Sequence, residues 1–177
     1  MSIEALQSLI PAYGRDLSLN LSNLLAETLL SDQQKWGTFL ACAHAIGVPA
    51  VVQNIEAAAA QALTSEAVTA AKAAAAIMGM NNVYFRALHL MHNKEYETLR
   101  SGLRMNALTN PGVDKVDFEL WALAVSAVNA CGLCMDSHEK VLRGHGVSAV
   151  QVQAALRIAA TVNAISAVLR AESALRA

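Results

Sequence analysis

Apolar positions dominate the chain, and they recur with the spacing of helices instead of the alternation of strands. The sequence is rich in Ala and Leu, and no pair of segments alternates apolar and polar residues as paired strands do. Residues that begin or end helices separate the apolar runs. The pattern therefore predicts an all-α fold, a helical bundle.

Helix caps mark where these elements begin and end. Ser31-Asp32-Gln33-Gln34 and Ser148-Ala149-Val150-Gln151 both have the form of a capping box, and Gly47 is placed to end the helix that the first box opens. Thr64-Ser65-Glu66 is expected to begin an Ala-rich helix that runs into Met78-Gly79-Met80.

A turn at Asn110-Pro111-Gly112 precedes the helix that carries Trp121, and either Asp114 or Asp117 can cap that helix. A long stretch with few charges follows, from Phe118 to Met135. Its polar residues and the glycine within it predict a buried core helix and a functional turn, not a membrane span.

The chain also contains a weak internal repeat. Residues 36–45 align with residues 121–130 at an offset of 85, and both segments begin with Trp. The offset places Gln34, Ile46 and Pro49 of the first copy against Glu119, Cys131 and Cys134 of the second. Chance similarity between Ala-rich segments is the alternative.

The repeat predicts one all-helical domain over residues 1–177, built from two copies of one helical unit. The pseudo-repeat covers about residues 31–90 and 115–172. The first copy has no reactive side chain at the positions that match Glu119, Cys131 and Cys134. We therefore expect the active site in the second copy.

The composition and net charge of the chain disfavour some classes of function. Apolar residues make up 55% of the 177 residues, charged residues make up 15%, and the net charge is −1. Such a chain can bury a core, and without a basic cluster it is not expected to bind nucleic acid or a membrane surface. Its apolar character favours self-association. Residues 1–5 lack the pattern of a signal peptide, so we expect a cytoplasmic protein.

Three cysteines are too few for a secreted disulfide scaffold. Two of them form the motif Cys131-Gly132-Leu133-Cys134, which in a reducing compartment is typical of a redox pair or a metal site. The third, Cys42, lies in an apolar run and is interpreted as a small buried hydrophobe.

The position of the motif favours redox chemistry. At the start of a helix, the partly positive N-terminus stabilises a thiolate. His138 follows Cys134 by four residues, so the two share a helix face and the imidazole can accept the thiol proton. Cys131 lies one turn earlier, where it can resolve a species formed on Cys134.

Glu119 is the only charged residue from Phe118 through Met135. A buried carboxylate needs a partner, and His138 is the partner that would orient the ring. The alternative places Glu119 in the first turn of its helix, facing solvent beside Asp117. The residues alone do not decide between the two.

A structural zinc site is the main alternative for the cysteine pair. Zinc needs four ligands, and Cys131, Cys134 and His138 supply three. His145 could be the fourth only if Gly144 ends the helix, and no second C-x-x-C exists. We therefore predict no metal. An inert buried pair is a further alternative, and a thioredoxin fold is disfavoured because it requires strands.

The remaining polar residues carry weaker signals. His44, His89 and His92 are interpreted as surface or hydrogen-bonded core residues. The pair Asn81-Asn82 inside a helical stretch is unusual, because asparagine competes for backbone hydrogen bonds, and it indicates a packed polar contact near the site.

Together these residues resemble the alkyl hydroperoxidase D family, within the carboxymuconolactone decarboxylase-like superfamily. The likeness rests on the spacing Glu119…Cys131-x-x-Cys134-x-x-x-His138 and covers nearly the whole chain, with residues beyond about 160 least specific. The other segments that carry it are Leu19–Ser22, Trp36–Thr38, Met78–Val83, Gly102–Asn106, Glu119–Trp121, Ser126–Cys131 and His138-Glu139.

The resemblance implies an all-helical duplicated fold that assembles as a homotrimer. It also implies an antioxidant thiol enzyme, a lipoyl-dependent peroxidase that regenerates a peroxiredoxin of the alkyl hydroperoxide reductase C type. Electrons would come from dihydrolipoamide on a lipoylated acyltransferase, replenished by dihydrolipoamide dehydrogenase, with no bound cofactor.

Site roles follow from the same resemblance. Cys134 is the peroxide-reactive thiol that passes through a sulfenic acid, and Cys131 is the proton donor and resolving thiol. Glu119 and His138 match the proton relay. Family members often carry a second histidine inside the C-x-x-C, where this chain has Leu133. The other functions considered are a decarboxylase-type carbon-acid enzyme with His138 as base, and a non-enzymatic thiol sensor.

Overall fold

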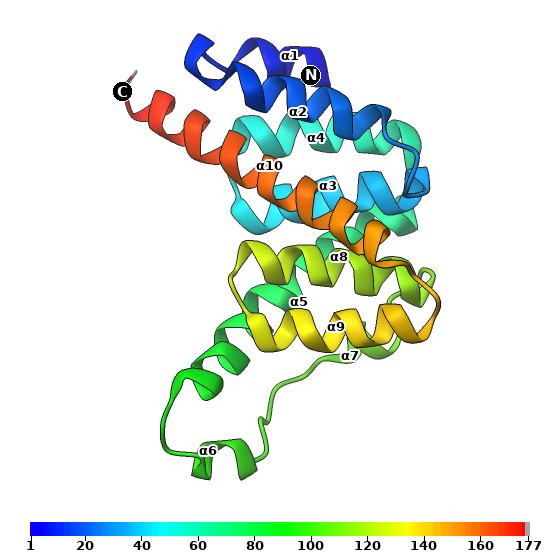
Figure 1. Ribbon diagram of the computed structural model, residues 1–177, viewed down its shortest axis with the longest axis vertical. Coiled ribbons are helices and arrows are strands. Elements are labelled where there is room, and N and C mark those ends of the chain that lie inside the picture. Colours follow the sequence, from blue (N-terminus) through cyan, green and yellow to red (C-terminus); the bar gives the residue numbers. More distant parts are fainter. Residues whose placement is uncertain (176–177) are drawn as a thin grey trace.

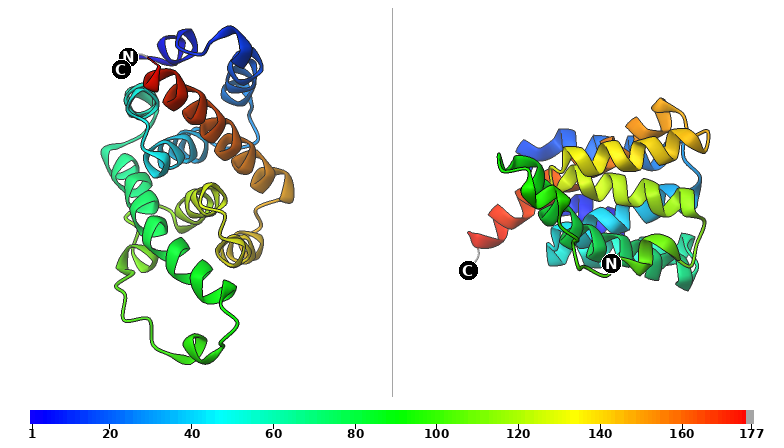
Figure 2. Two further views of the ribbon diagram at one scale, coloured as in Figure 1. Left: turned by 90° about the vertical axis from the view of Figure 1, so that its left-hand side faces the viewer. Right: turned by 90° about the horizontal axis from the view of Figure 1, so that it is seen from below.

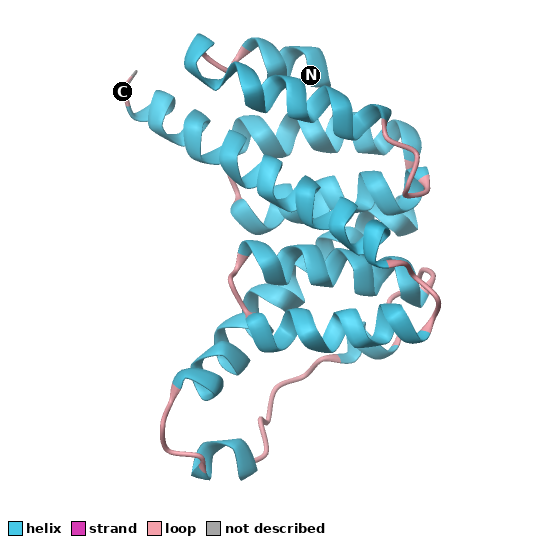
Figure 3. Cartoon of the chain, in the orientation of Figure 1, coloured by secondary structure: helices cyan, strands magenta, loops and turns pink. Residues whose placement is uncertain are grey.

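Helices are the only regular elements of the computed structural model, which describes residues 1–175 (Figures 1 and 3). The all-α prediction is confirmed. The helices are α1 (Ile3–Ser8), η1 (Ala12–Gly14), α2 (Arg15–Ala26), α3 (Asp32–Ile46), α4 (Pro49–Ala62), α5 (Ser65–Leu90), α6 (Glu95–Thr98), α7 (Asn106–Thr109), α8 (Lys115–Val128), α9 (Gly132–Gly144) and α10 (Ala149–Ala174).

The predicted caps lie at the helix ends. Ser31 and Ser148 each form a complete capping box, and Thr64 accepts a hydrogen bond from the Ala67 amide. Gly47 ends α3 with a φ of 76°, a left-handed conformation that favours glycine. Asp114 caps α8, so of the two candidates Asp117 is not the cap.

Helix α5 begins directly after Thr64, as the sequence predicted. It continues beyond Met80 to Leu90, through both asparagines. Asn81 and Asn82 are buried against neighbouring helices, and Asn82 forms hydrogen bonds to side chains there. Tertiary contacts thus outweigh the weak helix propensity of asparagine.

Helix α8 occupies the centre of the molecule. Every residue from Asp117 through Ser126 is buried, and α3, α5, α9 and α10 all pack against the helix (Figures 1 and 2). One apolar cluster joins α8 and α3 to the N-terminal helices and α10, and a second joins them to α5. Any polar side chain from Asp117 through Ser126 therefore has to find its partners inside the protein.

Helix α10 is long and apolar enough to cross a membrane by length and composition, but 56% of its apolar window is buried within the protein. It packs along α2, α3 and α8. This burial is that of a core helix.

Residues 91–105 form an arm that extends away from the helical body and carries α6 (Figures 1 and 2). The arm and its root expose several large apolar side chains, namely Leu90, Met91, Tyr96, Leu99 and Leu103. The chain then returns to the body through α7, which contacts α5.

Helix lengths recur along the chain. Helices α3, α4 and α5 contain 15, 14 and 26 residues, and α8, α9 and α10 contain 14, 13 and 26. The order and lengths agree with the expected repeat, and the internal duplication stays a prediction.

Helices α3 and α8 pack closely together at Gly37 of α3. The indole ring of Trp121 lies where a Cβ atom of residue 37 would be, and its Nε1 donates a hydrogen bond to the Gln34 carbonyl at 3.2 Å. Trp121 is fully buried. Only glycine allows this packing.

Substitution of Gly37 tests that packing. Gly37→Ala should lower the free energy of unfolding by about 1–3 kcal/mol, because the added methyl group forces a buried indole to move. Gly79→Ala is the matched control. Gly79 is also helical, but a Cβ there meets no atom within 4 Å, so we expect a gain of about 0.5–1 kcal/mol. Urea denaturation measures both, and equal effects would contradict the account.

Candidate active site

Cys131 and Cys134 lie at the start of α9 and form a disulfide bond, with their Cα atoms 5.3 Å apart. A short turn connects them to the end of α8. In this turn Ala130 has a φ of 54°, and the Cys131 amide donates to the Ser126 carbonyl at 3.0 Å. A left-handed conformation is costly for alanine, so local strain is retained next to the disulfide.

The two cysteines differ in their surroundings. Cys131 is fully buried, whereas Cys134 is 6% exposed and lines a cavity. Both lie at the N-terminus of α9, whose unpaired amide groups favour a thiolate once the disulfide is reduced.

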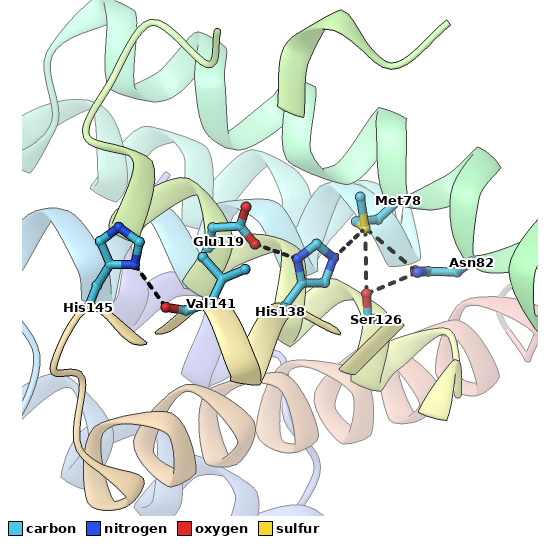
Figure 4. A network of polar contacts seen from close by, with 7 residues as sticks. All are labelled: Met78, Asn82, Glu119, Ser126, His138, Val141 and His145. Carbon is cyan, nitrogen blue, oxygen red and sulfur yellow. Dashed lines mark hydrogen bonds and ion pairs between the residues drawn. The ribbon is translucent and has the colours of Figure 1, made fainter. Parts of the chain in front are cut away.

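Glu119 and His138 form a buried hydrogen-bonded pair between α8 and α9 (Figure 4). Glu119 Oε2 lies 2.6 Å from His138 Nδ1, and the two residues are 7% and 8% exposed. Of the two positions that the sequence left open for Glu119, the structure has the one against His138. Its neighbour Asp117 is also buried and accepts hydrogen bonds from Gln33 and Gln34.

The second nitrogen of His138 faces the sulfur of Met78 on α5, with an Nε2–Sδ distance of 3.3 Å. Ser126 Oγ and Asn82 Nδ2 reach the same sulfur at 3.5 and 3.6 Å (Figure 4). Met78 is only 1% exposed. Three polar groups from three helices thus converge on one thioether.

Polar contacts continue from Asn82 toward the disulfide. Asn82 donates to Ser126 Oγ at 2.9 Å and accepts from Asn129 Nδ2 at 3.0 Å, and Arg86 donates to the Asn129 carbonyl. These contacts hold α5 against the turn that precedes Cys131. The predicted polar contact near the site is confirmed for Asn82.

Sequence reasoning missed Met78 and Ser126 as members of this site. Met78 and Asn82 are four residues apart on α5 and so share a face. The four-residue spacing indicates that Met78 and Asn82 lie on the same side of α5. It does not show that this side faces the site unless the packing of α5 against α8 and α9 is known.

A cavity of about 360 Å³ adjoins Cys134 and His138. Helix α9 forms one wall through Leu133, Cys134, Ser137 and His138. Most other lining side chains are apolar, and they come from α5 and from the segment that includes α7: Met78, Asn81, Phe85, Met105 and Leu108. Leu133, the residue inside the C-x-x-C, is 45% exposed and lies in this wall. The cavity therefore suits a ligand with apolar surface.

Metal ligation was the alternative considered for the cysteines. Within residues 1–175, no group of three or more His, Cys, Asp or Glu side chains is placed to hold a metal ion. His145, the candidate fourth ligand, follows the last residue of α9, and its ring contacts the Val141 carbonyl one turn back at 2.9 Å (Figure 4).

The other histidines and the third cysteine lie outside this site. Cys42 is fully buried in α3, as predicted, and burial raises the pKa of its thiol to about 12. His44 pairs with Glu56 at 2.8 Å, and Lys72 contacts the same carboxylate. These contacts hold the pKa of Glu56 below its usual value, chiefly through the hydrogen bond from Lys72. His89 and His92 are exposed.

Several known proteins that are similar to this chain share the name Alkyl hydroperoxide reductase AhpD. An Alkyl hydroperoxide reductase AhpD of Maricaulis maris is 66% identical over 173 residues, covering 98% of this chain and 100% of the relative. Proteins of the same name from Hyphomonas neptunium and Streptomyces griseus are 58% and 52% identical, each with at least 98% of both chains covered. The model of the Carboxymuconolactone decarboxylase family matches residues 94–177. The chain therefore belongs to the AhpD family.

Burial of Cys42 predicts its reactivity. In the reduced, folded protein an aromatic disulfide reagent should release two equivalents of thiol at mildly alkaline pH, since attack on Cys134 is followed by closure of the Cys131 disulfide. Cys42 should react only after denaturation, because its raised pKa and burial keep it protonated and covered. Rapid reaction of a third thiol in the folded protein would show that Cys42 is accessible.

Proposed function

We propose that the chain is a lipoyl-dependent peroxidase, which reduces hydroperoxides through a disulfide cycle of Cys134 and Cys131. One observation carries this proposal. Of the two disulfide-bonded cysteines, Cys134 lines the cavity, on the same wall as His138, and His138 is in turn paired with buried Glu119. A nucleophile (Cys134), a base on the same wall (His138) and a carboxylate that orients the base (Glu119) form the arrangement expected of an activated thiol.

The first half of the cycle oxidises Cys134. His138 accepts the thiol proton, and the thiolate attacks the terminal oxygen of the hydroperoxide. An S–O bond forms, the O–O bond breaks, and the alkoxide leaves as an alcohol with the proton from His138. Cys134 loses two electrons and becomes a sulfenic acid. Glu119 stabilises the imidazolium while it exists.

The second half closes the disulfide and reopens it. The Cys131 thiol attacks the Cys134 sulfur, and its proton leaves with the hydroxide as water. An external dithiol then reduces the disulfide by exchange and becomes a cyclic disulfide itself. No bound cofactor takes part in this cycle.

Dihydrolipoamide is the proposed electron donor. Its two thiols lie on a hydrocarbon chain, which matches a cavity lined by Leu108, Leu133 and Phe85. A lipoylated acyltransferase would present the dithiol, and dihydrolipoamide dehydrogenase would regenerate it. A peroxiredoxin of the alkyl hydroperoxide reductase C type is proposed as a second substrate, with its disulfide reduced by the same pair.

A cytoplasmic homotrimer is the proposed form of the protein. The apolar side chains of the arm support self-association, since exposed patches of that kind mark contact surfaces. The reducing cytoplasm suits a cysteine pair that cycles between thiols and disulfide. Sedimentation equilibrium measures the mass of the assembly.

A carbon-acid enzyme is the second candidate. The matching family model is described by decarboxylase chemistry, and His138 could act as its base. In that chemistry the Cys131–Cys134 disulfide has no role. A non-enzymatic thiol sensor would also be oxidised by peroxide, but it would not turn over.

A thiol titration with and without peroxide tests the peroxidase proposal. Peroxide should consume two thiols per chain, and dihydrolipoamide, but not NADH alone, should restore them. A cysteine pair that does not respond to peroxide would overturn the peroxidase proposal.

Serine variants assign the two thiols. Cys134→Ser should abolish peroxide reduction, whereas Cys131→Ser should accumulate a sulfenic acid on Cys134, detectable by a dimedone adduct in mass spectrometry. Cys42→Ala is the matched control, because it removes a buried thiol outside the site. Peroxide turnover that survives Cys134→Ser would refute the assignment.

A further inference from the structure

Asn81 is a buried polar residue that the mechanism above does not use. Its side chain is 3% exposed, and its Oδ1 has no hydrogen-bond partner among residues 1–175. Native proteins rarely leave a buried amide oxygen unpaired, because the lost hydration is not replaced. A ligand bound next to Asn81 would supply the missing hydrogen-bond partner.

The next residue, Asn82, is an example of an asparagine with a structural role on the same helix. Asn82 contacts Ser126, Asn129 and Met78. The adjacent amides therefore differ in role, since Asn82 joins α5 to α8 whereas Asn81 Oδ1 has no hydrogen-bond partner among residues 1–175.

Asn81 lines the same cavity as Cys134 and His138. On the α5 wall its neighbours are Met78 and Phe85, so the amide is the strongly polar group of that wall. The reactive thiol and its base are on the α9 wall. A small ligand in this cavity meets the amide from one helix and the thiol from the other.

We propose that the Asn81 carboxamide binds the hydroperoxide group of the substrate and orients it for attack by Cys134. The inference rests on the peroxidase function proposed above. A hydroperoxide has one O–H donor, and the amide oxygen is the acceptor that lacks one. The Cβ–Cγ torsion of asparagine is broad, so the amide can turn either end to a ligand.

The geometry of the reaction follows from that hydrogen bond. The terminal oxygen, which carries the hydrogen, is held at the amide and receives the Cys134 thiolate. The inner oxygen takes the proton from His138 as the O–O bond breaks. The organic part of the substrate then lies against apolar side chains such as Phe85 and Leu108, which favours organic hydroperoxides over hydrogen peroxide.

Asn81→Leu is the direct test, because leucine has a similar size and no polar group. With tert-butyl hydroperoxide as probe, kcat/KM should fall about ten- to hundredfold, the loss expected for one substrate hydrogen bond in a buried site. Reduction of the disulfide by dihydrolipoamide, followed separately, should fall by a much smaller factor, because the dithiol shares the apolar cavity but has no hydroperoxide group for the amide to bind. The Tm should stay the same or rise, since an unpaired buried amide has been removed.

Asn82→Leu is the matched comparison. It removes contacts to three residues, so it should lower the Tm and slow both half-reactions. Asn81→Ala serves as a second variant in case leucine does not fit, with the same expected split between the half-reactions.

Two results would overturn the proposal. In one, both Asn81 variants keep the wild-type kcat/KM for the hydroperoxide. In the other, they lower the Tm and slow both half-reactions, as a purely structural residue would. A wild-type protein that consumes no hydroperoxide would instead refute the peroxidase function, and this inference with it.

Discussion

The buried contact between Glu119 and His138 is the interaction on which the site depends. Helix α8 is buried from Asp117 through Ser126, so a carboxylate at residue 119 has little contact with bulk water. Removing a charge from water is costly unless a partner compensates it, and His138 at 2.6 Å is that partner. The pair joins α9 to α8, and thereby places Cys134, one turn before His138, at the cavity.

Met78 extends this constraint to a third helix. Its sulfur faces the other nitrogen of His138, so the ring is held from both sides. The thioether sulfur carries no proton of its own, so it contacts the ring without exchanging a proton with it. Asn82 and Ser126 hold the same sulfur in place, so α5 contributes to the site although it carries none of the reacting groups.

Local signals in the sequence predicted much of this arrangement. The capping boxes at Ser31 and Ser148 marked helix starts, and the i, i+4 spacing of Cys134 and His138 put both on one face of α9. The choice between two positions for Glu119 required tertiary information, because only the packing of other helices around residues 117–126 separates this side chain from solvent. The α5 wall was unpredicted for the same reason: Met78 is 60 residues from His138, and helical spacing alone does not identify the helix that a face contacts.

The central claim is that the Glu119–His138 pair activates Cys134. The most direct measurement is the rate at which iodoacetamide alkylates Cys134 at neutral pH in Cys131→Ser protein, where Cys42 is buried. Adding Glu119→Gln or His138→Gln to this variant should slow alkylation at least about tenfold, because less of the thiol is present as thiolate. Equal rates in all three proteins would contradict the account.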